Sequence, residues 1–421
     1  MSADQIGAPA RTAWGAGLEP LLERLDGEAE AMVARTEAWS AINSGSHELA
    51  GLQRMRAPLA DAFAALPGAV TVEPLPPSQR VRADGEVIDI EHAPSIRVTV
   101  RPDAPIKVAL TGHYDTVFSA AHSFQQPWRE GDLLRGPGAA DMKGGLSLML
   151  AALQAFEHLP GANRVGYEVL MSPDEEIGSL GSAPLLADLG RRAHVGMTYE
   201  PALADGTLVD ARKGSGNFSF AFHGRSAHVG RAFSDGRNAV MAAAEAALAL
   251  DQLNGQRDGV TFNIGAIDGG SPVNVVPDRA VLRFNVRAPD NGGTAWAQAE
   301  IKRIADGVGG REGLTAHLHG GITRPPKPIT PTQAKIISWT RTAGAALGLD
   351  LKFQASGGVC EGNNLAAAGC PNIDTLGPCG GNIHSDQEFA LIPSFSERAK
   401  LSFLLLAGIE REVFDIADLR A

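Results

Sequence analysis

Apolar residues recur with helical spacing in the first sixty-odd positions of the chain. One face of a predicted helical segment would carry Leu21, Leu22, Leu25, Met32 and Trp39, and a second face Leu49, Leu52, Met55, Leu59 and Phe63. From about residue 70, short apolar runs alternate with helical patterns. Strands are predicted over 70–72, 95–100, 107–110, 167–171 and 195–199, and helices over 146–156 and 183–189. This alternation predicts an α/β sheet that is at least partly parallel, with ligands at the carboxyl ends of its strands.

The pattern changes near residues 211–216. We expect strands over 217–223, 260–266, 280–287 and 314–318, with helices over 236–253 and 294–304 between them. This β-α-β-β-α-β order predicts a compact α+β module. The stiff segment Pro325-Pro-Lys-Pro328 then leads to helices over 333–347 and 394–414. The predicted organisation is a catalytic domain made of residues 1–212 and 326–421, interrupted by an inserted domain at 213–325.

Composition narrows the class of protein. A chain of 421 residues favours two domains, and a net charge of −11 without a Lys/Arg stripe argues against a nucleic-acid partner. The three cysteines, without Cys-x-x-Cys spacing, predict reduced thiols in a reducing compartment. No basic start followed by an apolar run is visible, and the longest apolar runs are too short to cross a bilayer. We therefore expect a cytoplasmic protein with no membrane partner.

The candidate chemistry lies at predicted strand ends. His113 and Asp115 follow one strand, two residues apart and therefore on one side of an extended chain. Comparable positions carry Asp141, Glu175, Glu176, Glu200 and His384. Two histidines and several carboxylates suit one or two divalent metal ions. Each residue alone also has an ordinary interpretation: Asp141 could cap a helix, and the acidic run at 174–176 could be a solvated loop.

Six motifs in order resemble one known family. They are Gly112-His-Tyr-Asp-Thr-Val117, Gly136-Pro-Gly-Ala-Ala-Asp-Met-Lys-Gly-Gly145, Pro173-Asp-Glu-Glu-Ile-Gly178, Tyr199-Glu-Pro201, Gly224-Arg-Ser-Ala-His-Val-Gly230 and Asn382-Ile-His-Ser-Asp386. The chain thus resembles the co-catalytic dizinc family of glutamate carboxypeptidase, acetylornithine deacetylase, succinyl-diaminopimelate desuccinylase and aminoacylase. The resemblance implies a zinc-exopeptidase-like α/β catalytic domain with a mixed, largely parallel sheet, and an inserted ferredoxin-like α+β domain that acts as lid and dimerisation domain.

The resemblance also implies a ligand set for two Zn²⁺ ions, with Co²⁺ or Mn²⁺ as possible substitutes. His113 and Glu200 would bind one ion and Glu176 and His384 the other, with Asp141 bridging them. Asp115 would accept the second ring N–H of His113 and fix its tautomer. Family members carry a cis peptide after the bridging aspartate, so we expect one between Asp141 and Met142.

Further roles follow from the same resemblance. Glu175 would be the general base for a metal-activated water. His228 would reach the active site of a partner subunit and stabilise the oxyanion, which implies a homodimer through the inserted domain and a closing motion. Asn274, Arg287, Arg324 and the backbone at Gly358 would contact substrate, the arginines because a guanidinium offers a carboxylate two parallel donors.

One departure bears on specificity. After Ser356-Gly-Gly358, where many relatives carry a small residue and Asp, this chain reads Val359-Cys-Glu-Gly-Asn-Asn364, so the shape of the substrate pocket is open. Our first hypothesis is a carboxypeptidase or N-acyl-amino-acid deacylase that cleaves an amide next to a free carboxylate. A dipeptidase or aminopeptidase of the same family is the alternative. A non-catalytic metal-binding relative and a purely structural oligomer are two further classes, and the second leaves the metal-type residues unexplained.

Overall fold

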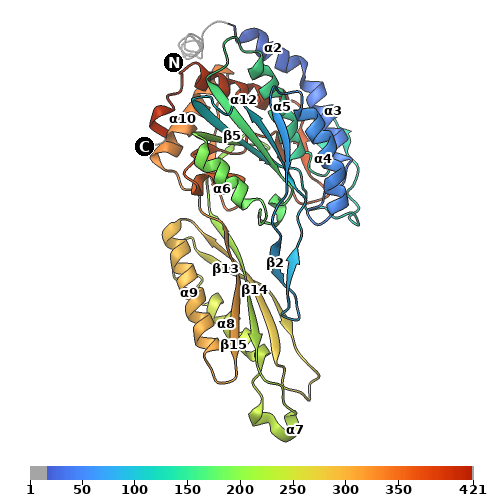
Figure 1. Cartoon of the computed structure of the whole chain (residues 1–421), viewed down its shortest axis with the longest axis vertical. Coiled ribbons are helices and arrows are strands. Elements are labelled where there is room, and N and C mark those ends of the chain that lie inside the picture. Colours follow the sequence, from blue (N-terminus) through green and yellow to red (C-terminus); the bar gives the residue numbers. More distant parts are fainter. Residues whose placement is uncertain (1–16, 420–421) are drawn as a thin grey trace.

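The computed structural model describes residues 17–419, and these form two lobes (Figure 1). The larger lobe is built on a six-stranded sheet in the order β1-β4-β8-β5-β9-β17. Its strands are β1 (Ala69–Glu73), β4 (Ser95–Val100), β5 (Ile106–His113), β8 (Val165–Ser172), β9 (Val195–Thr198) and β17 (Asn372–Ile373). The strands from β8 to β17 are parallel, whereas the β1–β4 and β4–β8 pairings are antiparallel. The predicted mixed, largely parallel sheet is confirmed.

Both faces of this sheet are covered by helices. Val108 and Leu110 of β5 belong to the main core, whereas Ala109 between them belongs to a smaller core on the opposite face. This alternation is the two-residue period of a strand that is buried on both sides. The main core is covered by α2 (Glu19–Gly27), α3 (Ala29–Ser40), α4 (Leu49–Phe63), α5 (Lys143–Glu157), α10 (Pro331–Ala346) and α12 (Ser394–Glu410). The smaller core is covered by α6 (Ala183–Arg192) and α11 (Glu361–Ala367).

Smaller strand groups complete the lobe. A five-stranded sheet has the order β10-β18-β19-β7-β6, from β6 (Trp128–Glu130), β7 (Leu133–Arg135), β10 (Ala202–Leu203), β18 (Cys379–Gly381) and β19 (Phe389–Leu391). A two-stranded parallel pair joins β11 (Leu208–Arg212) to β16 (Phe353–Ser356). The last element among the described residues is the short 3-10 helix η3 (Ala417–Leu419). All three cysteines are buried and free, as the sequence predicted. Within residues 17–419, no helix has the length and apolar character needed to cross a bilayer.

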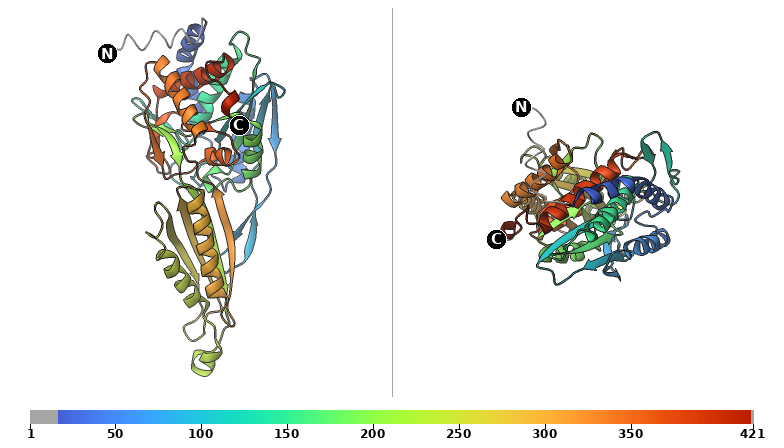
Figure 2. Two further views of the ribbon diagram at one scale, coloured as in Figure 1. Left: turned by 90° about the vertical axis from the view of Figure 1, so that its left-hand side faces the viewer. Right: turned by 90° about the horizontal axis from the view of Figure 1, so that it is seen from above.

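The second lobe is the ferredoxin-like module that the sequence predicted, and we call it the lid. Its antiparallel sheet has the order β13-β14-β12-β15. The elements are β12 (Gly214–His223), α7 (Val229–Ala232), η2 (Phe233–Asp235), α8 (Ala239–Asp251), β13 (Thr261–Gly269), β14 (Arg279–Ala288), α9 (Asn291–Gly309) and β15 (Thr315–Arg324). The helices α8 and α9 cover one face of the sheet around a separate apolar core (Figure 2). The exact boundaries at 212/213 and 325/326 stay a prediction.

A β-hairpin that the sequence analysis missed connects the lobes. Strands β2 (Ser78–Val81) and β3 (Val87–Ile90) leave the larger lobe and lie along the lid (Figure 1). A small buried cluster of Val81 with Ala221 and Val281 attaches this hairpin to the lid sheet. The lid is therefore attached to the larger lobe by this hairpin as well as by the two segments of the chain that enter and leave the lid.

Candidate metal centre

Three neighbouring parallel strands bring the candidate ligands together. His113 is the last residue of β5, Glu176 lies in the 3-10 helix η1 (Glu175–Ile177) after β8, and Glu200 follows β9. Because parallel strands end at the same edge of a sheet, these side chains converge. Asp141 and His384 arrive from loops, and the peptide bond from Asp141 to Met142 is cis, as predicted.

The five predicted ligands form one polar cluster. His113 Nε2 lies 3.1 Å from Asp141 Oδ1 and 3.9 Å from Glu200 Oε2. His384 Nε2 lies 3.0 Å from Glu176 Oε2 and 3.3 Å from Asp141 Oδ2. The two oxygens of Asp141 thus face different histidines. The groups His113, Asp141, Glu176 and His113, Glu175, Glu200 each have ligand atoms within 4.8 Å of one another.

The donor set fits a divalent cation. Imidazole nitrogens and carboxylate oxygens are ligands for Zn²⁺ and related ions. Glu200 is nearly buried, and its Oε1 has no hydrogen-bond partner in the described structure. Burial, together with the charge of Asp141, raises the pKa of Glu200 to about 7. Burial also raises the pKa of Glu176 well above its usual value, whereas hydrogen bonds to Asp141 and Glu176 raise the pKa of His384 to about 11. A crowded set of buried carboxylates is the environment that a cation stabilises.

Asp115 ties the ligand loops to each other. Its Oδ1 accepts the backbone N–H of Glu175 at 3.1 Å, and its Oδ2 accepts that of Glu176 at 3.2 Å and the hydroxyl of Ser46 at 2.7 Å. Its Oδ1 is also 3.3 Å from His113 Nδ1, which lies nearer, at 3.1 Å, to the backbone carbonyl of Asp115. Asp115 is therefore placed both to orient the imidazole and to hold the loop after β8.

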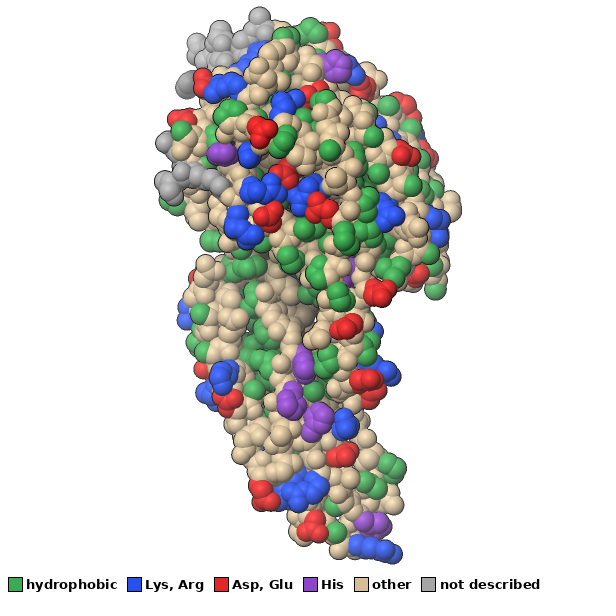
Figure 3. Space-filling model, viewed as in Figure 1, with side chains coloured by type: hydrophobic (Ala, Val, Ile, Leu, Met, Phe, Trp, Pro, Cys, Tyr) green, Lys and Arg blue, Asp and Glu red, His purple; other side chains and the backbone are tan. Residues whose placement is uncertain are grey.

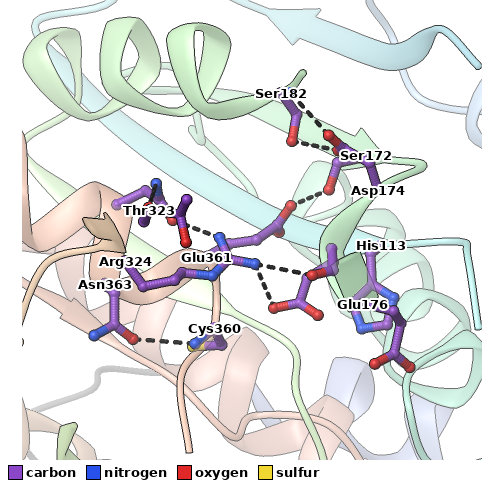
Figure 4. Close-up of polar contacts among 12 residues, drawn as sticks. His113, Ser172, Asp174, Glu176, Ser182, Thr323, Arg324, Cys360, Glu361 and Asn363 are labelled. Atoms are coloured by element: carbon purple, nitrogen blue, oxygen red, sulfur yellow. Dashed lines mark hydrogen bonds and ion pairs between the residues drawn. The ribbon is translucent and has the colours of Figure 1, made fainter. Parts of the chain in front are cut away.

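Glu175, the predicted general base, is buried beside an arginine. Arg324 Nη2 donates to Glu175 Oε1 at 2.6 Å and to the Glu175 backbone carbonyl at 3.2 Å, and its Nη1 donates to Asn364 Oδ1 at 2.5 Å. Burial raises the pKa of Glu175 despite the opposing charge of Arg324. Figure 4 shows Arg324 reaching from the end of the lid sheet toward Glu176 and His113. In this arrangement Arg324 contacts the candidate base, where the sequence predicted a contact with substrate.

A cavity of about 450 Å³ opens onto the cluster. Arg287 and Gly358 line it together with Arg324 and the ligands Asp141, Glu176, Glu200 and His384. Arg287 is half-buried, and its guanidinium donates to Asn285 Oδ1 at 3.0 Å and to the Gly357 carbonyl at 3.3 Å. Burial lowers its pKa, and no carboxylate within residues 17–419 pairs with it.

His228 and Asn274 lie elsewhere in the single chain. Both are exposed near α7, at the far tip of the lid (Figure 1). His228 caps α7 by accepting the Gly230 N–H at 3.1 Å, and the Asn274 carbonyl accepts the Val229 N–H at 3.0 Å. One chain therefore does not bring these two residues to the candidate metal centre.

Several buried acidic residues at the site were missed by the sequence analysis. Glu388 accepts the backbone N–H groups of Gly138, Ala140 and Asp141, and Asp174 accepts those of Gly181 and Ser182. Glu361, at the start of α11, hydrogen-bonds Ser172 (Figure 4). The only sequence signal was proximity: Asp174 adjoins Glu175, Glu388 follows His384 by four residues, and Glu361 lies in the departure from the family pattern.

An α/β domain with a His/Asp/Glu cluster at its strand ends, together with a ferredoxin-like lid, has the ligand types of a metal-dependent enzyme. The model of peptidase family M20/M25/M40 matches residues 109–407, and the chain belongs to this family. The resemblance read from the six motifs is thereby confirmed, and the protein is an amide-bond hydrolase of a metal-dependent family.

Individual relatives differ in their named activities. The chain is 27% identical to carboxypeptidase G2 of Pseudomonas sp. (strain RS-16) over 71% of its own length and 73% of that protein. It is 29% identical to succinyl-diaminopimelate desuccinylase of Methylocella silvestris over 65% of its own length and 73% of that protein. Two solved structures share the fold. Aminopeptidase PepT of Bacillus cereus has a TM-score of 0.68 at 21% identity, covering 91% of this chain and 99% of that one. The metallo-carboxypeptidase Sso-CP2 of Sulfolobus solfataricus has a TM-score of 0.70 at 16% identity, covering 90% and 99%.

Proposed function

We propose that the protein is a carboxypeptidase or N-acyl-amino-acid deacylase that cleaves an amide next to a free carboxylate. The observation that carries this proposal is Arg287, a half-buried cation that lines the cavity without a carboxylate partner among the described residues. A guanidinium in that position favours an anionic ligand. The acidic residues that line the same cavity are Asp141, Glu175, Glu176 and Glu200, so none is left over to bind the free amine of an aminopeptidase or dipeptidase substrate.

We further propose two Zn²⁺ ions, with Co²⁺ or Mn²⁺ as substitutes. His113 and Glu200 would hold one, Glu176 and His384 the other, and Asp141 both. The support is that the two oxygens of Asp141 face different histidines, at 3.1 and 3.3 Å. Such ions would supply Lewis acidity to a water molecule and to the amide carbonyl. Glu175 would accept a proton from the attacking water and later donate it to the leaving nitrogen. The pKa raised by burial suits Glu175 to both roles.

The substrate-side proposal is tested with Arg287→Ala and the matched variant Arg287→Lys. On N-acyl-amino acids, Arg287→Ala should lower kcat/KM by roughly tenfold to a hundredfold, since it removes a charge-assisted contact. The corresponding amino-acid amides, which lack the carboxylate, should be poor substrates for every variant. Equal turnover of acids and amides by the parent protein would refute the carboxylate specificity. For the base, Glu175→Ala should retain metal and lose nearly all turnover; normal turnover would refute that assignment.

We also propose that the protein is a homodimer in which His228 serves the active site of its partner. The support is its exposed position at the lid tip together with Asn274, away from the cluster of its own chain. His228→Ala and Glu175→Ala should each be nearly inactive. Mixed subunits should regain activity, because one site of the heterodimer then has both residues. Absence of recovery after verified subunit exchange would refute action between subunits.

A further inference from the structure

The β2–β3 hairpin forms a wall between the two lobes. At its far end, Val81 packs against Ala221 and Val281, and Arg283 Nη2 donates to the Val81 carbonyl at 3.3 Å. At its base, Ser78 lies 2.9 Å from His92 Nε2, and His92 is in turn 4.0 Å from Asp174, next to the candidate base. The hairpin is thus fixed at both ends, and the space beneath it is bounded by the hairpin and by the lid sheet.

That space is a second cavity of about 560 Å³. Its apolar wall comes from the hairpin residues Val81, Val87 and Ile90 and from Ile177 and Leu180 of the loop after β8. Val87 and Leu180 are 38% and 39% exposed, so the wall is open to a ligand. The surface is hollowed at this junction between the lobes (Figure 3). A cavity of this size accommodates a group as large as a medium acyl chain or an aromatic ring.

The two cavities adjoin each other. We call the one at the metal cluster the catalytic cavity and the one beneath the hairpin the hairpin cavity. Both are lined by Ile177, Asn217, Asn285 and Thr323. Along β14, Arg287 lines only the catalytic cavity, Arg283 only the hairpin cavity, and Asn285 lies between them and lines both. Since alternate residues of a strand share one face at a spacing of about 7 Å, the two cavities follow one face of the lid sheet. A substrate whose carboxylate meets Arg287 and whose amide lies at the metal cluster therefore extends its acyl side toward the hairpin.

The lining also defines the chemistry of that acyl side. No aspartate or glutamate is among the described residues that line the hairpin cavity, so a free amine would find no counter-charge there. Two arginines line the cavity: the guanidinium of Arg283 is already paired with Asp268, and Arg80 on the hairpin is solvent-exposed, so its charge is hydrated. We infer that the hairpin cavity binds the acyl portion of the substrate and that this portion is a neutral apolar chain or ring. This inference rests on the proposed function and specifies the substrate class within it.

The test compares N-octanoyl with N-acetyl derivatives of glutamate, methionine and phenylalanine on the zinc-loaded protein. Each buried methylene should raise kcat/KM by about fourfold, the equivalent of about 0.8 kcal/mol. Because the cavity is open, we expect roughly a tenfold to hundredfold preference for octanoyl overall. Val87→Asp should reduce this octanoyl-to-acetyl ratio at least about tenfold. Val72→Asp is the matched control: Val72 is 48% exposed on β1 and lines neither cavity, so its ratio should equal that of the parent protein.

Three outcomes would overturn the inference: no dependence on acyl length, a preference for succinyl or free-amine substrates, or an unchanged ratio in Val87→Asp. A binding arm separates it from the proposed function. Octanoate and acetate are titrated by calorimetry into the Glu175→Ala protein with and without Val87→Asp. Octanoate binding that Val87→Asp removes, in a protein whose parent cleaves no acyl-amino acid, would preserve the cavity assignment and refute the reaction. Absence of octanoate binding to the Glu175→Ala protein, together with normal amide cleavage by the parent protein, would refute the cavity assignment and preserve the proposed reaction.

Discussion

Asp115 provides the sharpest test of how the site is held together. Its carboxylate accepts the N–H groups of Glu175 and Glu176, at 3.1 and 3.2 Å, in a fully buried position. Asp115→Ala leaves both amides without a partner, and each orphaned buried donor costs about 1–3 kcal/mol. The Ser46 hydroxyl can still donate to the Thr116 carbonyl at 3.4 Å and adds little. We therefore expect a loss of about 2–6 kcal/mol for Asp115→Ala. Asp115→Asn retains one acceptor oxygen and should lose about half as much.

The assay is urea unfolding in EDTA, so that metal release does not enter the comparison. Hydrogen exchange of residues 172–180 should accelerate in parallel, because the two amides belong to that loop. Asp61→Ala, at an exposed position on α4, is the control and should stay within about 0.5 kcal/mol of the parent protein. In the metal-loaded protein, Asp115→Ala should also weaken metal affinity by roughly tenfold to a hundredfold. An Asp115→Ala protein as stable as the Asp61→Ala control, with unchanged exchange, would refute the reasoning.

Three further predictions follow from buried groups and close contacts. Burial opposes ionisation of Asp374, but Arg212 and Lys327, at 2.9 and 2.7 Å, hold its pKa at about 2. This folded-state pKa lies below the ordinary value of 3.8, so the stabilisation is present above pH 4 and lost as the pH falls toward 2. Asp374→Asn should therefore be destabilised at pH 7 by about 3–5 kcal/mol, with the gap to the parent protein narrowing in acid; a constant gap in unfolding experiments would contradict this. EDTA should abolish hydrolysis and lower the Tm, and Zn²⁺ should restore both; activity that survives exhaustive chelation would exclude a metal requirement. A Cβ at Gly145 would lie 2.1 Å from the Tyr199 carbonyl oxygen, so Gly145→Ala should be strongly destabilising. Gly307→Ala in α9, where a Cβ would meet nothing within 4 Å, should instead stabilise by about 0.5–1 kcal/mol. Similar Tm shifts for the two variants would contradict the close approach of α5 to Tyr199.

Much of the fold was predictable because its signals are local. The apolar runs that become β5, β8 and β9 and the long helix α5 appear directly in the hydrophobic pattern, and the chemistry follows from which residues stand at the ends of those runs. His113 and Glu200 were therefore found before any contact was known. The β-α-β-β-α-β order of the lid elements along the chain was predicted from the same kind of local pattern.

Features that depend on distant partners were not predictable in this way. The β2–β3 hairpin pairs two four-residue strands of mixed polarity around Asp84-Gly85, a turn signal that was present in the sequence. Its attachment to Val281 is a contact across about 200 residues. Arg324 was assigned to substrate because a guanidinium suits a carboxylate. In the structure, the carboxylate it meets is that of Glu175, 149 residues away in the chain. The residue type of Arg324 predicted that its partner would be a carboxylate, but only the folded structure identified that carboxylate as Glu175.

The acidic residues outside the ligand set indicate how catalysis and specificity are separated in this protein. Asp115, Asp174 and Glu388 each accept two or more backbone N–H groups from a loop that carries, or adjoins, a candidate ligand or the base. Such contacts fix the loop backbone without depending on the side chains between the ligands. None of the described residues that line the hairpin cavity is acidic, and its apolar wall comes from exposed or half-buried side chains except for Val81, which is buried. Substitutions there can therefore change the acyl group that is accepted while the metal centre keeps its geometry.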